Sequence, residues 1–128
     1  MTGHAYKNTG FTLIELLVVM TVIALLLTLA LPRYLGSVDK SKEAVLKENL
    51  ALMRDSLDKY YGDQGRYPDA IEDLVSKKYL RRIPADPITE SATTWVIVPP
   101  EDAQKGAVYD VRSGATEPAR DGTAYRDW

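Results

Sequence analysis

The sequence predicts an α+β fold in which a long N-terminal helix packs on a small antiparallel sheet of two or three strands. An apolar run over residues 11–31 carries a single charge, Glu15, and apolar residues recur at helical spacing over residues 32–61. The helix should therefore have a membrane-spanning half and an amphipathic half. Segments rich in β-branched and aromatic residues, or alternating apolar with polar ones, follow later. The expected strands cover residues 93–98, 107–112 and 123–127.

The apolar run is long enough to cross a membrane. At about 1.5 Å per residue, a helix over residues 11–31 would reach about 31 Å, which matches the hydrocarbon core of a bilayer. An ordinary secretory signal is cut after its apolar core, whereas the best candidate cut site here, Gly10-Phe11, precedes it. Cleavage after Gly10 would therefore keep the span.

Glu15 lies inside this span and needs a partner. An ionised acid at the middle of a membrane helix costs about 2.5–3.5 kcal/mol, and less near the end, where Glu15 lies. Cleavage would create an α-amino group at Phe11, and an ion pair about 4 Å apart is worth about 4 kcal/mol at an effective dielectric near 20. The amine could belong to the same chain or to a neighbour, but only a neighbour's amine makes assembly favour the pairing. The alternative is a plain membrane anchor whose acid reaches the interface.

Residues 10–34, with the sequence GFTLIELLVVMTVIALLLTLALPRY, resemble the processing and assembly segment of type IV pilins and type II secretion pseudopilins. This resemblance implies a pilin-like fold and cleavage after Gly10 by a prepilin peptidase. It further implies N-methylation of Phe11 and docking of Glu15 on the terminal amine of a neighbouring subunit.

The same resemblance implies how the chain is divided and where it resides. The divisions are a leader (residues 1–10), a transmembrane and assembly helix (11–31) and a periplasmic domain (32–128). The implied location is the bacterial inner membrane, crossed once, with a filament after assembly. The implied partners are further copies of the chain, minor pseudopilins, the prepilin peptidase and methyltransferase, the inner-membrane assembly platform and membrane lipid.

One helix is expected from about residue 12 to about residue 61, with a local break at Pro32. Beyond Pro32, an apolar stripe should face the soluble domain, while charged side chains form i,i+4 pairs on the solvated face. The stripe comprises Leu35, Val38, Val45, Leu46, Leu50, Met53, Leu57, Tyr60 and Tyr61. The pairs are Glu43 with Lys47, Arg54 with Asp58, and Asp55 with Lys59.

A loop over residues 62–68 should end the long helix, because it contains two glycines and a proline. A short helix is expected over residues 70–76, with Asp69 as its cap and Glu72 as the capping-box partner. The surrounding pattern is typical of the major pseudopilins that the chain resembles. Its elements here are Tyr67-Pro68, Tyr79-Leu80, Ile83-Pro84 and Asp86-Pro87.

The composition argues against catalysis and nucleic-acid binding. The chain has 16 basic and 18 acidic residues and so does not have the strongly basic balance of a nucleic-acid-binding domain. It has no cysteine, and its single histidine, His4, lies in the expected leader, so the processed chain would lack both nucleophilic cysteine and histidine. Neither enzyme activity nor a nucleic-acid partner is expected.

Residues 109–128 resemble the loop that binds calcium in many major pseudopilins, but they lack its dense glycine- and aspartate-rich ending, and Pro118 and Arg120 intrude. Calcium takes about 6–8 oxygen ligands, more than the side chains of this segment supply. An ion-free loop without a cofactor is therefore expected, with Tyr125 and Trp128 pinning the segment to the core. The side chains that could supply some ligands are Asp110, Ser113, Glu117, Asp121 and Asp127.

The function that the resemblance implies is that of a structural subunit of a type II secretion-like pseudopilus. One alternative is a type IV pilin for adhesion, motility or DNA uptake, although such pilins often have a larger domain with a cysteine-bridged loop. Another alternative is a membrane-anchored periplasmic binding module that does not polymerise.

Overall fold

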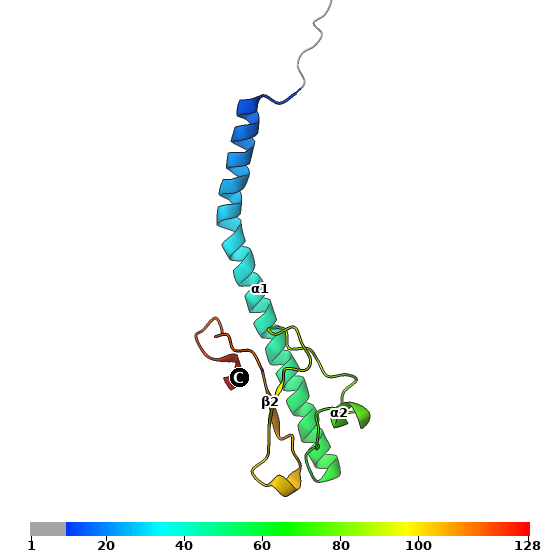
Figure 1. Cartoon of the computed structure of the whole chain (residues 1–128). Helices are drawn as coiled ribbons and strands as arrows, with labels where there is room; N and C mark the ends of the chain where they lie inside the picture. The colour runs from blue at the N-terminus through cyan, green and yellow to red at the C-terminus, as the bar shows by residue number, and fades with distance from the viewer. Residues whose placement is uncertain (1–9) are drawn as a thin grey trace, which may run out of the picture. The chain divides into compact units, whose positions relative to one another are not determined.

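The computed structural model describes residues 10–128, which divide between Ser37 and Val38 into two compact units. The first unit ends at Ser37 and contains the start of helix α1 (Leu13–Gln64), and the second is Val38–Trp128 (Figure 1). The leader predicted for residues 1–10 lies outside the described residues, apart from Gly10, and so does His4.

Helix α1 runs through Pro32 without interruption, so the predicted break is wrong. Pro32 removes only the hydrogen bond that its N–H would make to the carbonyl of Thr28, within a helix of 52 residues. An apolar surrounding offers the backbone no other partner, which favours the helix on both sides of the proline. The predicted long helix itself is confirmed, with bounds Leu13–Gln64.

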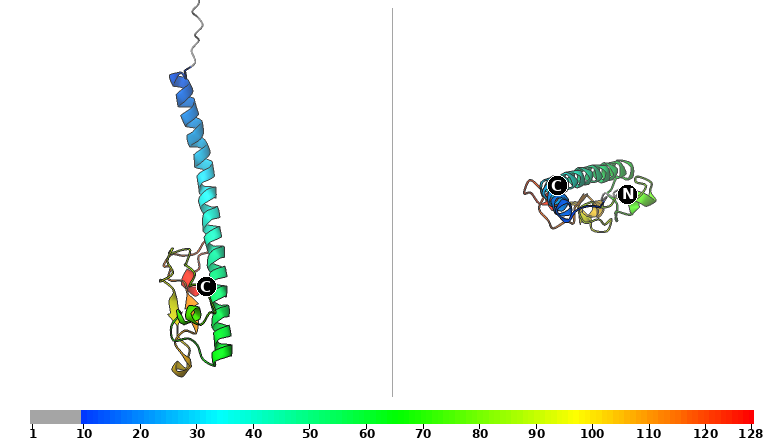
Figure 2. Two further views of the ribbon diagram at one scale, coloured as in Figure 1. Left: turned by 90° about the vertical axis from the view of Figure 1, so that its right-hand side faces the viewer. Right: turned by 90° about the horizontal axis from the view of Figure 1, so that it is seen from above.

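The second unit is built on one apolar face of α1. Residues on this face are spaced alternately by four and three positions, so they form one stripe along the helix. The buried apolar residues of α1 are Leu46, Leu50, Met53, Leu57 and Tyr60. The rest of the core comes from later segments, which lie along one side of this part of α1 in the left view of Figure 2. Figure 1 is turned by 90° from that view and shows them in front of and beside the helix. The core residues from these segments are Leu74, Leu80, Trp95, Val108, Val111, Ala115, Ala119 and Tyr125.

The sheet has two short antiparallel strands, β1 (Val96–Val98) and β2 (Asp110–Arg112). Ile97 lies opposite Val111, and Val111 is fully buried against the helix side of the core. Both strands fall inside the segments predicted from the sequence but are shorter. A two-stranded hairpin of this size is marginal alone, so it depends on the core that it shares with α1.

The third strand predicted over residues 123–127 is wrong. The described chain has a 3-10 helix there, η3 (Tyr125–Asp127), and a single isolated bridge joins Pro118 to Ala124. Pro118 has no N–H with which to continue a ladder, so pairing stops at that bridge. Another 3-10 turn, η2 (Ala103–Lys105), lies between the two strands.

The predicted short helix is present, but the predicted capping by Asp69 and Glu72 is wrong. Helix α2 covers Asp73–Ser76, shorter than predicted. Asp69 does not cap it and instead pairs with Arg66, with a nitrogen-to-oxygen distance of 2.7 Å. The Asp73 carboxylate accepts the N–H of Ala70 at 3.3 Å, while Glu72 makes no side-chain capping bond. The acids at this end thus serve a tight turn, as short polar side chains commonly do.

Asp86, from the predicted Asp-Pro pair, links its own turn to Ser113, the residue that follows β2. It is fully buried, and its carboxylate accepts the hydroxyl of Ser113 at 2.5 Å and the N–H of Ile88 at 2.8 Å. Next to Ser113, a side chain at Gly114 would collide with the main-chain carbonyl of Thr94. The close approach of these two backbone segments therefore requires glycine.

We predict that Gly114→Ala destabilises the second unit by about 1–3 kcal/mol, the usual cost of overpacking, because the Thr94 carbonyl cannot move aside as a flexible side chain would. Gly62→Ala is the matched control, since Gly62 lies in α1 with open space around it. This control should be neutral or stabilising by up to about 1 kcal/mol. Thermal unfolding of the full chain in detergent measures both, and equal melting temperatures for the two variants would refute the packing account.

Candidate assembly site

The first turn of α1 is capped by Thr12. Its hydroxyl accepts the N–H of Glu15 at 3.1 Å, and its carbonyl accepts the N–H of Leu16 at the same distance. Thr12 and Glu15 therefore stand in the positions of a capping box, with Thr12 as N-cap and Glu15 three residues later. The signal for this cap, Thr-x-x-Glu before an apolar run, was present in the sequence, but our sequence analysis missed it.

Glu15 lies in the first turn of α1, where the positive end of the helix dipole favours an acid by about 0.3–1 kcal/mol. That is less than the cost of about 2.5–3.5 kcal/mol for an acid deep in a membrane. Among residues 10–128, the Glu15 carboxylate forms no ion pair. The helix end thus stabilises Glu15 in part and leaves its carboxylate available to a cation.

The Gly10-Phe11 bond precedes the helix and is exposed. Phe11 is 81 % exposed, and a side chain built at Gly10 would meet nothing within 4 Å. The described fold therefore places no steric demand for glycine at this position.

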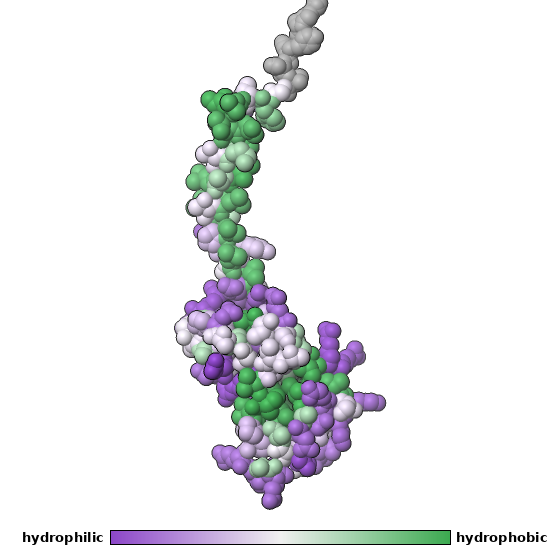
Figure 3. Space-filling model, in the orientation of Figure 1, coloured by the Kyte–Doolittle hydropathy of each residue, from purple (hydrophilic) through white to green (hydrophobic). Residues whose placement is uncertain are grey.

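The span that follows exposes large apolar side chains along its length, and apolar residues make up much of the face seen in Figure 3. By length and composition α1 can cross a membrane, and the most apolar part of it is not buried within the chain. Its two inner threonines satisfy their own hydroxyls, with Thr21 donating to the carbonyl of Leu17 at 2.7 Å and Thr28 to that of Ala24 at 2.8 Å. Such back-bonding makes a hydroxyl tolerable in lipid.

The predicted calcium ligands are engaged elsewhere and do not converge. Asp110 pairs with Arg54, and Ser113 donates to Asp86. Asp121 accepts the N–H of Thr123 at 3.0 Å and its hydroxyl at 2.6 Å. Asp127 in η3 and Glu117 lie on the exposed surface. Within residues 10–128, no group of three or more acidic, histidine or cysteine side chains gathers as a metal site would require.

Polar side chains on α1 hold the C-terminal segment, defined as residues 117–128. Glu43 accepts the phenol O–H of Tyr125 at 2.8 Å and the N–H of Arg120 at 2.9 Å. Tyr125 packs edge-to-face on Trp128, with ring centres 5.0 Å apart. Tyr125 is buried in the core and Trp128 packs against it, so the prediction that these two aromatics pin the segment to the core is confirmed. Burial, and then the bond to the Glu43 carboxylate and its charge, raise the pKa of Tyr125 to about 12.

These long-range contacts correct the sequence analysis of the helix charges. Of the three i,i+4 pairs predicted for α1, only Asp55 with Lys59 forms, at 3.0 Å. Glu43 and Arg54 instead bond to residues more than fifty positions away. Helical spacing alone cannot reveal such partners, because it relates only residues one turn apart.

Comparisons with known proteins match the segment that contains this site and most of the rest of the chain. Residues 6–31 match the family described as "Prokaryotic N-terminal methylation motif", and this match includes Gly10, Phe11 and Glu15. The type II secretion system core protein G of Pseudomonas aeruginosa is 31% identical, over 63% of this chain and 68% of that protein. That of Pectobacterium carotovorum is 30% identical over 64% of this chain, which spans 63% of its length. That of Escherichia coli (strain K12) is 29% identical, over 87% and 83%. No solved structure matches.

We predict that the contribution of Tyr125 to the free energy of unfolding falls at alkaline pH. The pKa of Tyr125 is raised from 10.0 to about 12, so its contribution is complete below pH 10 and is lost as the pH rises toward 12. At neutral pH, Tyr125→Phe should therefore cost about 1.5–3 kcal/mol, the usual worth of a hydrogen bond to a charged group. The two proteins share every other ionisable group, so the difference between their free energies of unfolding reports on Tyr125.

Denaturant unfolding of the wild-type chain and of Tyr125→Phe in detergent, followed by tryptophan fluorescence, measures this difference at each pH. We expect it to shrink between pH 10 and 12. A difference that stays constant over this interval would show that folding does not raise the pKa of Tyr125.

Proposed function

The chain belongs to the type II secretion system core protein G family, the major pseudopilins, and on this premise we propose that it assembles as the structural subunit of a pseudopilus. The observation that carries the proposal is Glu15, an acid at the start of an exposed apolar helix with no ion-pair partner among residues 10–128. A role in assembly, and not in catalysis, accounts for that residue.

Processing creates the partner that Glu15 lacks. A prepilin peptidase cuts the exposed bond after Gly10, and N-methylation follows at Phe11. The match of residues 6–31 to the N-terminal methylation motif supports both steps. The new amine keeps its positive charge after methylation and can therefore still pair with a carboxylate.

Pairing between subunits gives the driving force for assembly. Lipid is as apolar as the span, so burying one span against another gains no hydrophobic free energy. Glu15 of an incoming subunit beside the Phe11 amine of its neighbour is an attraction that lipid does not offer, worth about 4 kcal/mol at about 4 Å and an effective dielectric near 20. Because the two partners are different surfaces, repeating the contact without closure produces a helical filament.

The single apolar helix and the pseudopilin relatives fit a protein that crosses the inner membrane once. We place the second unit, Val38–Trp128, in the periplasm, and the partners in assembly are further copies, minor pseudopilins and the inner-membrane platform. The relatives reported above are secretion proteins by name, which favours a pseudopilus over a type IV pilus and over a binding module that does not polymerise.

We predict that Glu15→Leu still inserts into the membrane but loses filament assembly almost completely, because the variant lacks the charge that pairs with the Phe11 amine. Glu48→Leu is the matched control, since Glu48 is an exposed acid of the same helix outside the span, and it should leave assembly intact. Fibres are counted by electron microscopy after overproduction, and secretion is assayed in a strain that lacks the wild-type chain.

Normal fibre yield from Glu15→Leu would refute the pairing mechanism. Fibres from the wild-type chain without any effect of its deletion on secretion would instead favour the pilus alternative. Absence of fibres from the wild-type chain, with the chain present in the membrane, would favour the anchored binding module.

A further inference from the structure

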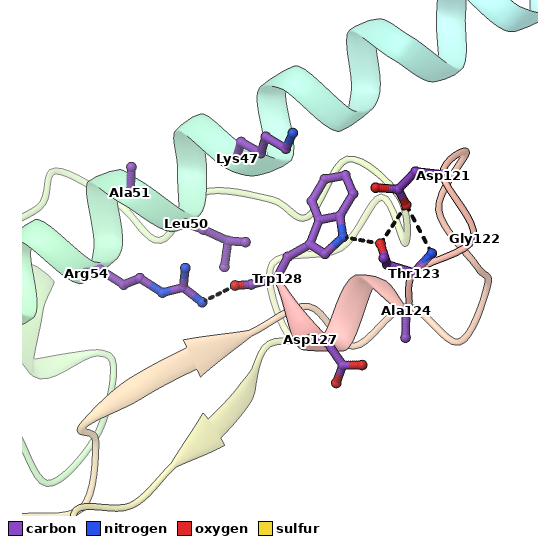
Figure 4. A pocket seen from close by; sticks show the side chains of 10 residues that line it. All are labelled: Lys47, Leu50, Ala51, Arg54, Asp121, Gly122, Thr123, Ala124, Asp127 and Trp128. Atoms are coloured by element: carbon purple, nitrogen blue, oxygen red, sulfur yellow. Dashed lines mark hydrogen bonds between the residues drawn. The ribbon is translucent and has the colours of Figure 1, made fainter.

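Arg54 gathers three oxygens from segments far apart in the sequence. Its Nε donates to Asp110 Oδ1 at 2.8 Å, and its Nη2 donates to the carbonyl of Val111 at 3.1 Å and to the main-chain oxygen of Trp128 at 2.9 Å. Figure 4 shows Arg54 reaching from α1 to Trp128. One guanidinium thus links α1, β2 and the end of the C-terminal segment.

The oxygens that Arg54 gathers are of the kinds that calcium binds. Calcium sites in proteins are built from carboxylate and main-chain carbonyl oxygens around a positive charge. Here the positive charge belongs to the guanidinium of Arg54, and the second oxygen of Asp110 lies 3.8 Å from Arg112. A divalent cation beside Asp110 would meet two arginines, so the residues present do not fit a calcium ion at this position.

Two further α1 side chains hold the same segment on the same face of the helix. Glu43 receives two hydrogen bonds from it, as described above, and the ammonium of Lys47 lies 4.8 Å from the centre of the Trp128 ring. Leu50, between them and Arg54, is buried. We call Glu43, Lys47 and Arg54 the α1 clasp. Their spacing of about one or two turns places all three over one strip of α1.

The segment also stabilises itself. Asp121 and Thr123 close a turn through the side chain of Asp121, and the indole N–H of Trp128 donates to the hydroxyl of Thr123 at 2.9 Å (Figure 4). Hydrogen bonds within the turn lower the pKa of Asp121, which keeps this acid ionised as an acceptor. The Asp121 carboxylate is therefore already engaged by Thr123, which in turn accepts from Trp128.

We propose that the α1 clasp fixes the C-terminal segment without a metal ion, with Arg54 supplying the positive charge that calcium supplies in relatives with a calcium loop. This proposal concerns the fold of the second unit and is independent of filament assembly. It explains why the acids of the segment are dispersed and why the half-buried Arg54 of α1 bonds to three oxygens from later segments.

The test uses the full chain in detergent, with about 1 mM calcium or with a chelator, a concentration at the weak end of extracellular calcium sites. We expect the same melting temperature in both conditions. Arg54→Ala should unfold at a lower temperature in both, and trypsin should cut after Arg120 and Arg126 about tenfold faster, because the segment detaches more often. Lys59→Ala is the control, since it removes only an exposed pair on the same helix.

Arg54→Lys keeps the charge but not the forked donor geometry, so it should fall between wild type and Arg54→Ala, and it serves if Arg54→Ala fails to fold. A rise in the melting temperature of the wild-type chain with calcium, or one calcium bound per chain in equilibrium dialysis, would overturn the proposal. So would trypsin cleavage of both Arg54 variants at the rate of Lys59→Ala. Because this assay measures unfolding and cleavage of the second unit and not filament formation, failure here leaves the assembly mechanism untouched.

Discussion

The second unit depends on the burial of one apolar stripe of α1. The sheet has only three residues in each strand, too few to persist without a partner layer. The helix supplies that layer through residues that recur every three or four positions between Leu46 and Tyr60. Three of the later elements contribute buried residues to the same core, namely Leu74 in α2, Val111 in β2 and Tyr125 in η3. The same helix therefore contains the span and supplies the layer on which the small domain packs.

The two halves of α1 use their polar residues in opposite ways. In the span, Glu15 has a cap for its own N–H but no charged partner among the described residues, which suits a contact made between chains. In the second unit, Glu43 and Arg54 are engaged within the chain and bind the C-terminal segment. An unpaired acid in an apolar setting favours association with a chain that offers a positive charge. Paired charges within a folded domain instead hold its segments in one arrangement.

Sequence patterns predicted the parts of the fold that depend on local periodicity. The long helix, the two strand segments and the part of the stripe from Leu46 to Tyr60 follow from apolar spacing, whereas Leu35 and Val45, predicted for the same stripe, are exposed. The pinning of Tyr125 and Trp128 follows from their size and polarity. The partners of Glu43 and Arg54 could not be predicted, because spacing along a helix says nothing about residues on a distant segment. The predicted break at Pro32 was wrong, because one missing N–H does not end a long helix. The predicted third strand was wrong, because Pro118 cannot donate to a ladder and pairing stops at a single bridge.

The central claim is that the partner of Glu15 is created by cleavage, and the mature N-terminus tests it most directly. Intact mass and N-terminal sequencing of the chain isolated from membranes should show that it begins at Phe11 with one added methyl group. A chain that begins at Met1, or well beyond Phe11, would contradict the account, because Glu15 would then have no neighbouring amine to meet.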